Sequence, residues 1–260
     1  MGQNFLIDPN LARAIAAEAG GGPGHRILEI GAGLGSLTVA LAATGADVLA
    51  VEFDRALLPA LDEVVSDLPN VRVLDADAMK IDWGRELAGG RRESAEGSWM
   101  MCSNLPYNIA VPIVLDLLEL APAVHRLVVT VQREVGERLA ASPGQQRYGA
   151  VSVRVAYRAR AEVVRRVPPS VFWPKPKVDS VVVRLDRLEA PPVAVDPRRL
   201  WLVIEAGFAQ RRKTMRSALR RLGLDAASAA AVLERCGLAP DARAEELGLV
   251  ELAAIAEALP

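Results

Sequence analysis

The stretch His25-Arg-Ile-Leu-Glu-Ile-Gly-Ala-Gly-Leu-Gly35 decides the fold class of this 260-residue chain. Its first six residues include Ile27, Leu28 and Ile30 and are typical of a buried strand, while the glycines that follow allow a tight turn. Residues 35–44 continue with a helical pattern, so the first N–H groups of a helix would face the turn. By itself this glycine motif is a weak signal, because a dinucleotide fingerprint would have glycine where Ser36 stands.

Short apolar runs and helical patterns alternate along the first half of the chain. Such alternation predicts a Rossmann-like α/β fold with a mostly parallel sheet and helices on both faces. Two later apolar runs flank a proline-rich loop at residues 168–176, and they predict an antiparallel hairpin on the sheet edge. Strands are predicted at residues 25–30, 47–52, 71–74, 98–103, 127–131, 161–167 and 178–185, helices at 35–44, 55–66, 109–120 and 132–141, and a surface loop at 84–98.

The chain is expected to form two domains. A Rossmann-like domain would cover residues 1–190 and a small α-helical domain residues 191–260, because prolines punctuate the segment 188–197. From Arg198 onward the pattern is compatible with helices throughout. The apolar stretch at residues 150–157 is compatible with either a helix or a strand.

The composition excludes several classes of protein. Hydrophobic residues make up 51% of the chain, which is enough to bury a sizeable core. Cys102 and Cys236 are too few for a disulfide framework or a thiolate zinc site, and His25 and His125 have no suitably spaced partners, so no metal is expected. The sequence shows neither a signal peptide nor a run of about 18 apolar residues. A cytoplasmic protein without membrane association is therefore expected, and the chain is expected to be a monomer.

The net charge of −1 is the sum of blocks with opposite signs. Residues 1–80 carry a net charge of −6, whereas residues 133–187 and residues 198–221 carry +7 each. A run of charges is usually a solvated face, but the density of these blocks favours a phosphate-binding surface. The candidate residues for this surface, which would bind RNA if the phosphates belong to RNA, lie on or beside one predicted helix, and they are Arg211, Arg212, Lys213, Arg216, Arg220 and Arg221.

Acidic residues stand at the ends of the next two predicted strands. Glu52 ends the second strand, where its carboxylate could accept both hydroxyls of a ribose, and Asp77 follows the third, where it could accept from an adenine amino group. Singly, each is more simply a solvated carboxylate. Ligands of open α/β sheets bind at the carboxyl ends of the strands, so the glycine turn and both acids together favour a nucleoside ligand. Dinucleotides and S-adenosylmethionine both fit this pattern.

The tetrapeptide Asn104-Leu-Pro-Tyr107 follows the fourth predicted strand. In isolation, a plain β-turn would explain it. Beside a methyl donor, however, the side-chain oxygen of Asn104 and the carbonyl of Leu105 could accept both N–H bonds of an adenine amine and direct its lone pair toward the methyl group. Pro106 would fix the turn, and Tyr107 would stack on the base.

Together these motifs resemble the ribosomal RNA adenine dimethylases, and most closely their bacterial small-subunit type. The resemblance covers nearly the whole chain. Its motifs are Gly2-Gln-Asn-Phe-Leu6, Glu29 to Gly35, Val51-Glu52, Asp77-Ala-Met79, Asn104 to Tyr107, Gln132 to Val135, Glu137-Arg-Leu139, Tyr148-Gly149, Val171 to Ser180 and Phe208 to Thr214. The chain departs from the family pattern at Met1-Gly2, where relatives carry a basic stretch, and at Ala32, where many have proline.

The resemblance implies a class I methyltransferase fold, S-adenosylmethionine as methyl donor, and dimethylation of two adjacent adenosines in the 3′-terminal hairpin of small-subunit RNA. The RNA itself or the immature small subunit would be the partner. Phe172 would stack on the extruded base opposite Tyr107, although the sequence alone favours a hydrophobic plug. The implied catalytic residues are Asn104, Leu105, Pro106, Tyr107 and Phe172, and the implied cofactor residues are Asn4, Leu6, Gly31, Gly33, Glu52, Asp77, Ala78 and Asn104.

Three alternative functions remain open from the sequence. The nearest is a related dimethylase that acts on large-subunit RNA and confers macrolide resistance, but the motifs at residues 171–180 and 208–214 favour the small-subunit type. A second is a ribosome-assembly factor with little or no activity, which the intact motif at residues 104–107 disfavours. A third is a nicotinamide oxidoreductase, which Ser36 and the lack of a hydride-transfer constellation disfavour.

Overall fold

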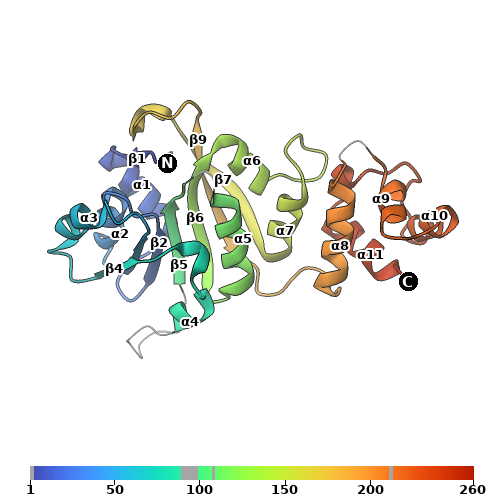
Figure 1. The fold of residues 1–260 in the computed structure, drawn as a ribbon, viewed down its shortest axis with the longest axis horizontal. Coiled ribbons are helices and arrows are strands. Elements are labelled where there is room, and N and C mark those ends of the chain that lie inside the picture. Colours follow the sequence, from blue (N-terminus) through green and yellow to red (C-terminus); the bar gives the residue numbers. More distant parts are fainter. Residues whose placement is uncertain (1–2, 89–98, 107–108, 211–212) are drawn as a thin grey trace. The chain divides into compact units, whose positions relative to one another are not determined.

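The computed structural model describes residues 3–88, 99–106, 109–210 and 213–260 (Figure 1). The chain forms two compact units, of which the first comprises residues 1–136 and 159–188 and the second residues 137–158 and 189–260. The junction at residue 188 lies beside the expected domain boundary. Residues 137–158 differ from the expectation, because their buried side chains Tyr148, Val153 and Tyr157 pack among those of the C-terminal helices.

A seven-stranded sheet forms the centre of the first unit. Its strands are β2 (Arg26–Ile30), β3 (Asp47–Glu52), β4 (Val71–Asp75), β5 (Trp99–Asn104), β6 (Val124–Gln132), β7 (Ala159–Val167) and β9 (Ser180–Arg187). In space they follow the order β4-β3-β2-β5-β6-β9-β7, in which the first five are parallel, β9 pairs antiparallel with β6, and β7 pairs antiparallel with β9. The expected mostly parallel sheet with an antiparallel edge pair is confirmed.

Two helices of the first unit, α1 (Pro9–Ala19) and α2 (Ser36–Ala42), share one hydrophobic core with the sheet. Ile15 of α1 and Leu41 of α2 are fully buried in this core beside strand residues such as Val128. The remaining helices of the N-terminal half are α3 (Leu58–Val65), α4 (Trp83–Ala88), α5 (Ala110–Leu120) and α6 (Arg133–Leu139).

Helix α1 is the main element that the sequence analysis did not predict. Its start carries a recognisable signal, because the side chain of Asp8 accepts hydrogen bonds from the N–H groups of Asn10 and Leu11 while Pro9 occupies the first turn. Gly20, in a left-handed conformation with φ of 75°, ends the helix. These capping residues were available in the sequence, but three of the four buried residues between them are alanines, whose small side chains give a weak hydrophobic signal.

The prediction of a surface loop at residues 84–98 is wrong in its first part. Residues up to Ala88 belong to α4, which is anchored by the buried side chains of Trp83 and Leu87. The rest of that expected loop, residues 89–98, lies outside the described residues. The ambiguous apolar stretch at residues 150–157 is helical.

A two-stranded antiparallel ribbon lies apart from the main sheet and joins two distant parts of the first unit. It pairs β1 (Phe5–Leu6) with β8 (Phe172–Trp173), so that Phe5 stands opposite Trp173 and Leu6 opposite Phe172. The N–H of Ile7 extends the ribbon by donating to the Val171 carbonyl at 2.9 Å. Figure 1 shows the yellow segment that carries β8 reaching the start of the chain near β1.

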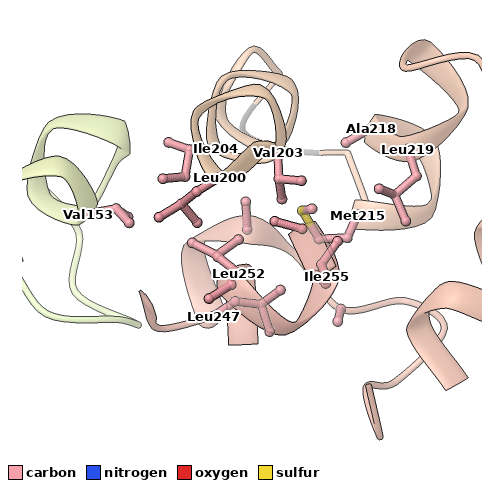
Figure 2. Close-up of a cluster of buried hydrophobic side chains, with 14 of the residues drawn as sticks. Val153, Leu200, Val203, Ile204, Met215, Ala218, Leu219, Leu247, Leu252 and Ile255 are labelled. Carbon is pink, nitrogen blue, oxygen red and sulfur yellow. The ribbon is translucent and has the colours of Figure 1, made fainter. Parts of the chain in front are cut away.

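The second unit is helical, as expected for the C-terminal part of the chain. Its elements are α7 (Ala150–Arg158), α8 (Pro197–Phe208), α9 (Met215–Arg221), α10 (Ala226–Arg235), the short 3-10 turn η3 (Ala244–Glu246) and α11 (Leu249–Ala258). Figure 2 shows the core that these helices enclose, with Leu200 and Val203 of α8 directed toward Leu252 of α11. The Tyr148 hydroxyl completes the core by donating to the Leu247 carbonyl at 2.8 Å.

One side chain of β9 satisfies the C-terminal end of α5. The guanidinium of Arg187 donates to the carbonyls of Leu117, Leu118, Ala121 and Val124 at distances of 2.6 to 3.0 Å. The last carbonyls of a helix have no partner inside the helix, and a cation there also favours the helix dipole. Arg187 therefore links the antiparallel edge of the sheet to a helix of the parallel part.

We expect Arg187→Met to lower the free energy of unfolding by about 3 kcal/mol, because several buried carbonyls lose a charged donor. Urea unfolding, followed by the fluorescence of the buried Trp83 and Trp99, measures this loss. Arg160→Met, at an exposed position of β7, is the matched control and should change stability by no more than about 0.5 kcal/mol. Equal losses in the two variants would contradict the role assigned to Arg187.

Candidate active site

A pocket opens at the carboxyl ends of the parallel strands β2, β3 and β5. This is the edge of the sheet where the sequence analysis placed a nucleoside ligand. Eight of the expected site residues line the pocket, namely Asn4, Leu6, Gly31, Gly33, Glu52, Asn104, Leu105 and Pro106.

The glycine turn brings backbone atoms close to two neighbouring segments. Gly31 and Gly33 have φ values of 76° and 60°, which side-chain-bearing residues rarely adopt. A Cβ atom on Gly31 would lie 3.3 Å from Cδ of Pro106, and one on Gly33 would lie 3.2 Å from Cδ1 of Phe5. Both the dihedral angles and the close packing therefore require glycine at these positions.

Glu52 at the end of β3 is held by backbone donors. Its Oε2 accepts from the Gly33 N–H at 2.8 Å, and its Oε1 accepts from the N–H groups of Phe53 and Asp54 at 2.9 and 2.8 Å. Its side chain is buried, with 5% of the residue exposed. The carboxylate is thus fixed in place, and its remaining lone pairs can still accept hydrogen bonds from a ligand.

Asp77 and Ala78 follow β4, the strand next to β3, and they do not line the pocket itself. The Ala76 N–H donates to the Glu52 carbonyl at 3.1 Å, which ties this segment to the end of β3. Oδ1 of Asp77 accepts from the Met79 N–H at 3.1 Å and caps a short 3-10 turn, η1 (Ala78–Lys80). Both expected residues therefore stand beside the pocket, on the side of Glu52.

Asn104 ends β5 and faces the turn from the opposite side. Its Nδ2 donates to the Asn4 carbonyl at 3.0 Å, which fixes the amide plane and leaves Oδ1 as an acceptor. The next two residues are held as well, because the Leu105 N–H donates to the Thr130 carbonyl at 3.2 Å and the Pro106 ring packs against Gly31. The structure thus brings the first three residues of the tetrapeptide to the pocket.

The aromatic clamp expected from the sequence is not assembled in the described residues. Tyr107 lies outside them. Phe172 is only 3% exposed and belongs to the hydrophobic core of the first unit, together with Leu6 and Val167. Successive residues of a strand face opposite sides, and in β8 it is Phe172 that faces the core and Trp173 that faces solvent.

Gln3 and Glu29 are among the pocket residues that the sequence analysis did not predict as site residues. Gln3 donates from Nε2 to Oδ2 of Asp54 at 3.3 Å, and Glu29, the last residue but one of β2, is 1% exposed. Thr38 donates from Oγ1 to the Glu29 carboxyl at 2.6 Å. A charged residue inside an otherwise apolar strand was the available signal for Glu29, because such a group is rarely buried without a function.

Burial raises the pKa of the Glu29 carboxyl to about 8. The hydrogen bond from Thr38 acts in the opposite direction, and the negative charge of Glu52 adds to the rise. Near neutral pH the Glu29 carboxyl of the unliganded pocket is therefore mainly protonated. A cationic ligand in this pocket would favour its ionised form.

The four described residues of the expected RNA-binding group all belong to the second unit and are exposed. Lys213 precedes α9, and Arg216, Arg220 and Arg221 lie on that helix. Arg216 donates to the Ala226 carbonyl at 3.2 Å, and Arg221 donates to a carbonyl of α8. The other two expected residues, Arg211 and Arg212, lie outside the described part of the chain.

Two further searches of the described residues gave no candidate. No helix in this part of the chain is long and apolar enough to cross a membrane. Within the same residues, no group of at least three His, Cys, Asp or Glu side chains is arranged so that it could hold a metal ion.

We expect the stability of the unliganded protein to fall as the pH rises from about 4.5 to about 8, because the unfolded chain releases the Glu29 proton while the folded chain retains it. Glu29→Gln should flatten this fall by more than about 1 kcal/mol, which corresponds to one pKa unit. Thermal unfolding at a series of pH values measures the difference. Glu63→Gln, on the exposed face of α3, serves as control, and identical pH profiles for all three proteins would contradict a buried, protonated Glu29.

Comparison with known proteins gives matches along the whole chain. Residues 1–259 match the family described as ribosomal RNA adenine dimethylase. Ribosomal RNA small subunit methyltransferase A of Moorella thermoacetica is 43% identical over 261 residues, covering 99% of this chain and 91% of the relative. The protein of the same name from Thermobifida fusca is 43% identical over 265 residues, covering 100% and 89%.

Solved structures agree with this assignment. The crystal structure of a dimethyladenosine transferase from Plasmodium falciparum has the same fold, with a TM-score of 0.79 over 96% of this chain and 95% of that chain at 22% identity. The 23S rRNA methyltransferase ErmE has a TM-score of 0.74 over 98% and 99% of the two chains at 26% identity. The Rossmann-like methyltransferase fold is thereby confirmed, and this chain belongs to the ribosomal RNA adenine dimethylase family.

Proposed function

We propose that this chain transfers methyl groups from S-adenosylmethionine to N6 of two adjacent adenosines in the 3′-terminal hairpin of small-subunit ribosomal RNA. It acts as a monomer in the cytoplasm, on the RNA or on an immature small subunit. The names of the relatives that are 43% identical over their near-entire length support the small-subunit substrate. The observation that carries the chemistry is the position of Asn104, whose amide stands in the pocket opposite Glu52.

The residues of the pocket suit a cationic nucleoside cofactor. The fixed Glu52 carboxylate binds the ribose hydroxyls, Asp77 and Ala78 bind the adenine, and the turn at Gly31 and Gly33 lies against the methionine part. When bound, S-adenosylmethionine supplies an electrophilic methyl group on its sulfonium. The acidic lining formed by Glu29 and Glu52 favours the positive charges of this cofactor over a neutral analogue.

Asn104 prepares the adenine amine for attack. The lone pair of this amine is delocalised into the ring, so the nitrogen is a poor nucleophile. When Oδ1 of Asn104 and the Leu105 carbonyl accept its two N–H bonds, the nitrogen becomes more nearly tetrahedral and its lone pair points at the methyl carbon. The bond from Nδ2 to the Asn4 carbonyl supports this orientation, because it fixes which side of the amide faces the substrate. The proton on the product nitrogen leaves to solvent.

The target base must leave its stack to reach this pocket, which costs a few kcal/mol. Tyr107 is the residue we assign to stacking on the extruded base. The buried position of Phe172 gives no support for a second stacking face from that residue. Phosphate contacts from the basic residues at 211–221 offset part of the cost of extrusion.

A substrate panel tests the proposal. Purified protein receives labelled S-adenosylmethionine together with under-methylated small subunits, naked small-subunit RNA or large-subunit RNA. We expect label in small-subunit RNA, at two adjacent adenosines of the terminal hairpin. Label confined to large-subunit RNA would overturn the substrate assignment in favour of the activity named for ErmE. No label in any RNA would instead indicate a binding factor without activity.

We expect Asn104→Ala to reduce kcat by at least about 100-fold, the loss typical for removing one positioned hydrogen-bonding group from an active site. Methyl transfer under single-turnover conditions measures this loss, and filter binding measures RNA affinity in parallel. RNA binding should remain within about twofold, because Asn104 contacts one base and no phosphate. A variant that methylates normally, or one that loses RNA binding instead, would show that the role of Asn104 is misplaced.

A further inference from the structure

Trp173 is a large exposed aromatic side chain beside the pocket, and it has no role in the function proposed above. Trp173 is 64% exposed, while its neighbour Phe172 is 3% exposed. The exposed indole offers a large, flat aromatic face on which another ring could stack. Trp173 ends β8 in the ribbon that also contains β1 (Figure 1).

The ribbon places Trp173 next to the pocket lining. Trp173 is paired with Phe5, and directly opposed residues of an antiparallel pair project to the same face, with Cα atoms about 5 Å apart. Phe5 itself lines the pocket and lies against the glycine turn. Asn4, the residue before Phe5, accepts the hydrogen bond from Asn104. Trp173 is therefore paired with Phe5, and the residue before Phe5 carries the carbonyl that orients the Asn104 amide.

Cations follow this ring in the chain. Lys175 and Lys177 are exposed, and neither forms an ion pair with any residue that the structure describes. The acidic residue that comes next, Asp179, is already paired with Arg133 at 3.3 Å. Pro174 and Pro176 fix the backbone φ angles on both sides of Lys175, so the loop has fewer conformations to lose when a ligand binds.

An aromatic face with neighbouring cations is the combination that binds single-stranded nucleic acid, because bases stack on the ring while lysines bind phosphates. We propose that Trp173 stacks on the nucleotide adjoining the target adenosine and that Lys175 and Lys177 bind the flanking phosphates. This inference rests on the proposed function and extends its RNA-binding surface into the first unit. When the target adenosine is extruded, the base next to it loses a stacking neighbour, and the Trp173 ring takes that neighbour's place.

Methylation kinetics on a short hairpin test the inference. We expect Trp173→Ala to lower kcat/KM by about 5- to 100-fold, the range that corresponds to the loss of one base–aromatic stack, and Trp173→Phe to retain most of the activity. The isolated cofactor should bind both variants as it binds the parent chain, and thermal unfolding should be unchanged because the ring is exposed. Leu120→Ala removes an equally exposed apolar side chain from α5 and is the matched control.

Two further hairpins separate stacking from other effects, one with an abasic nucleotide on the 5′ side of the target adenosine and one with it on the 3′ side. On the hairpin that lacks the stacking base, the parent chain and Trp173→Ala should have the same kcat/KM. Unchanged kinetics of Trp173→Ala on the intact hairpin would overturn the inference, and so would an equal loss on both abasic RNAs, which would point to a protein contact. The parent chain is measured on the intact hairpin first. If the proposed function is wrong, this first measurement shows no methylation, and that result is distinct from any difference between the parent chain and a variant.

Discussion

The pocket depends on one carboxylate. Glu52 accepts a hydrogen bond from Gly33 and two more from the residues that follow it, so a single side chain joins the turn after β2 to the end of β3. This link fixes the turn against Pro106, whose segment carries Asn104, and against Phe5, which pairs with Trp173 of β8. Buried ionised groups are stable only when such donors surround them. In this rRNA adenine dimethyltransferase, the group that fixes the turn therefore also supplies the negative charge that suits a sulfonium ligand.

The sequence predicted the arrangement of the site better than the arrangement of the chain around it. Gly31, Glu52 and Asn104 could be placed together because parallel strands end at a common edge of a sheet, whatever the loops between them do. Helix α1 escaped prediction because three of its four buried residues are alanines, which give only a weak hydrophobic signal. Residues 137–158 were assigned to the wrong part of the chain, since chain order alone does not show which core an apolar face will join.

Two residues show where pattern reasoning reaches its limit. Phe172 and Trp173 are neighbouring aromatics in a short strand, and only their pairing with β1 determines which one faces the core. The buried strand around Glu29 was predicted, but the pKa of about 8 also depends on Thr38 and Glu52, which the fold brings to that carboxyl. The facing of Phe172 and Trp173 and the pKa of Glu29 therefore depend on contacts between separate segments, which composition and spacing do not contain.

The bonds that Arg187 makes to the end of α5 have a consequence for how the protein is made. They join residues 63 to 70 positions apart, and the segment between them includes residues 137–158, which belong to the other unit. During synthesis the end of α5 remains without these donors until β9 has left the ribosome. The first unit therefore cannot complete its sheet as the chain emerges in order, and its folding waits for a strand that follows a part of the second unit.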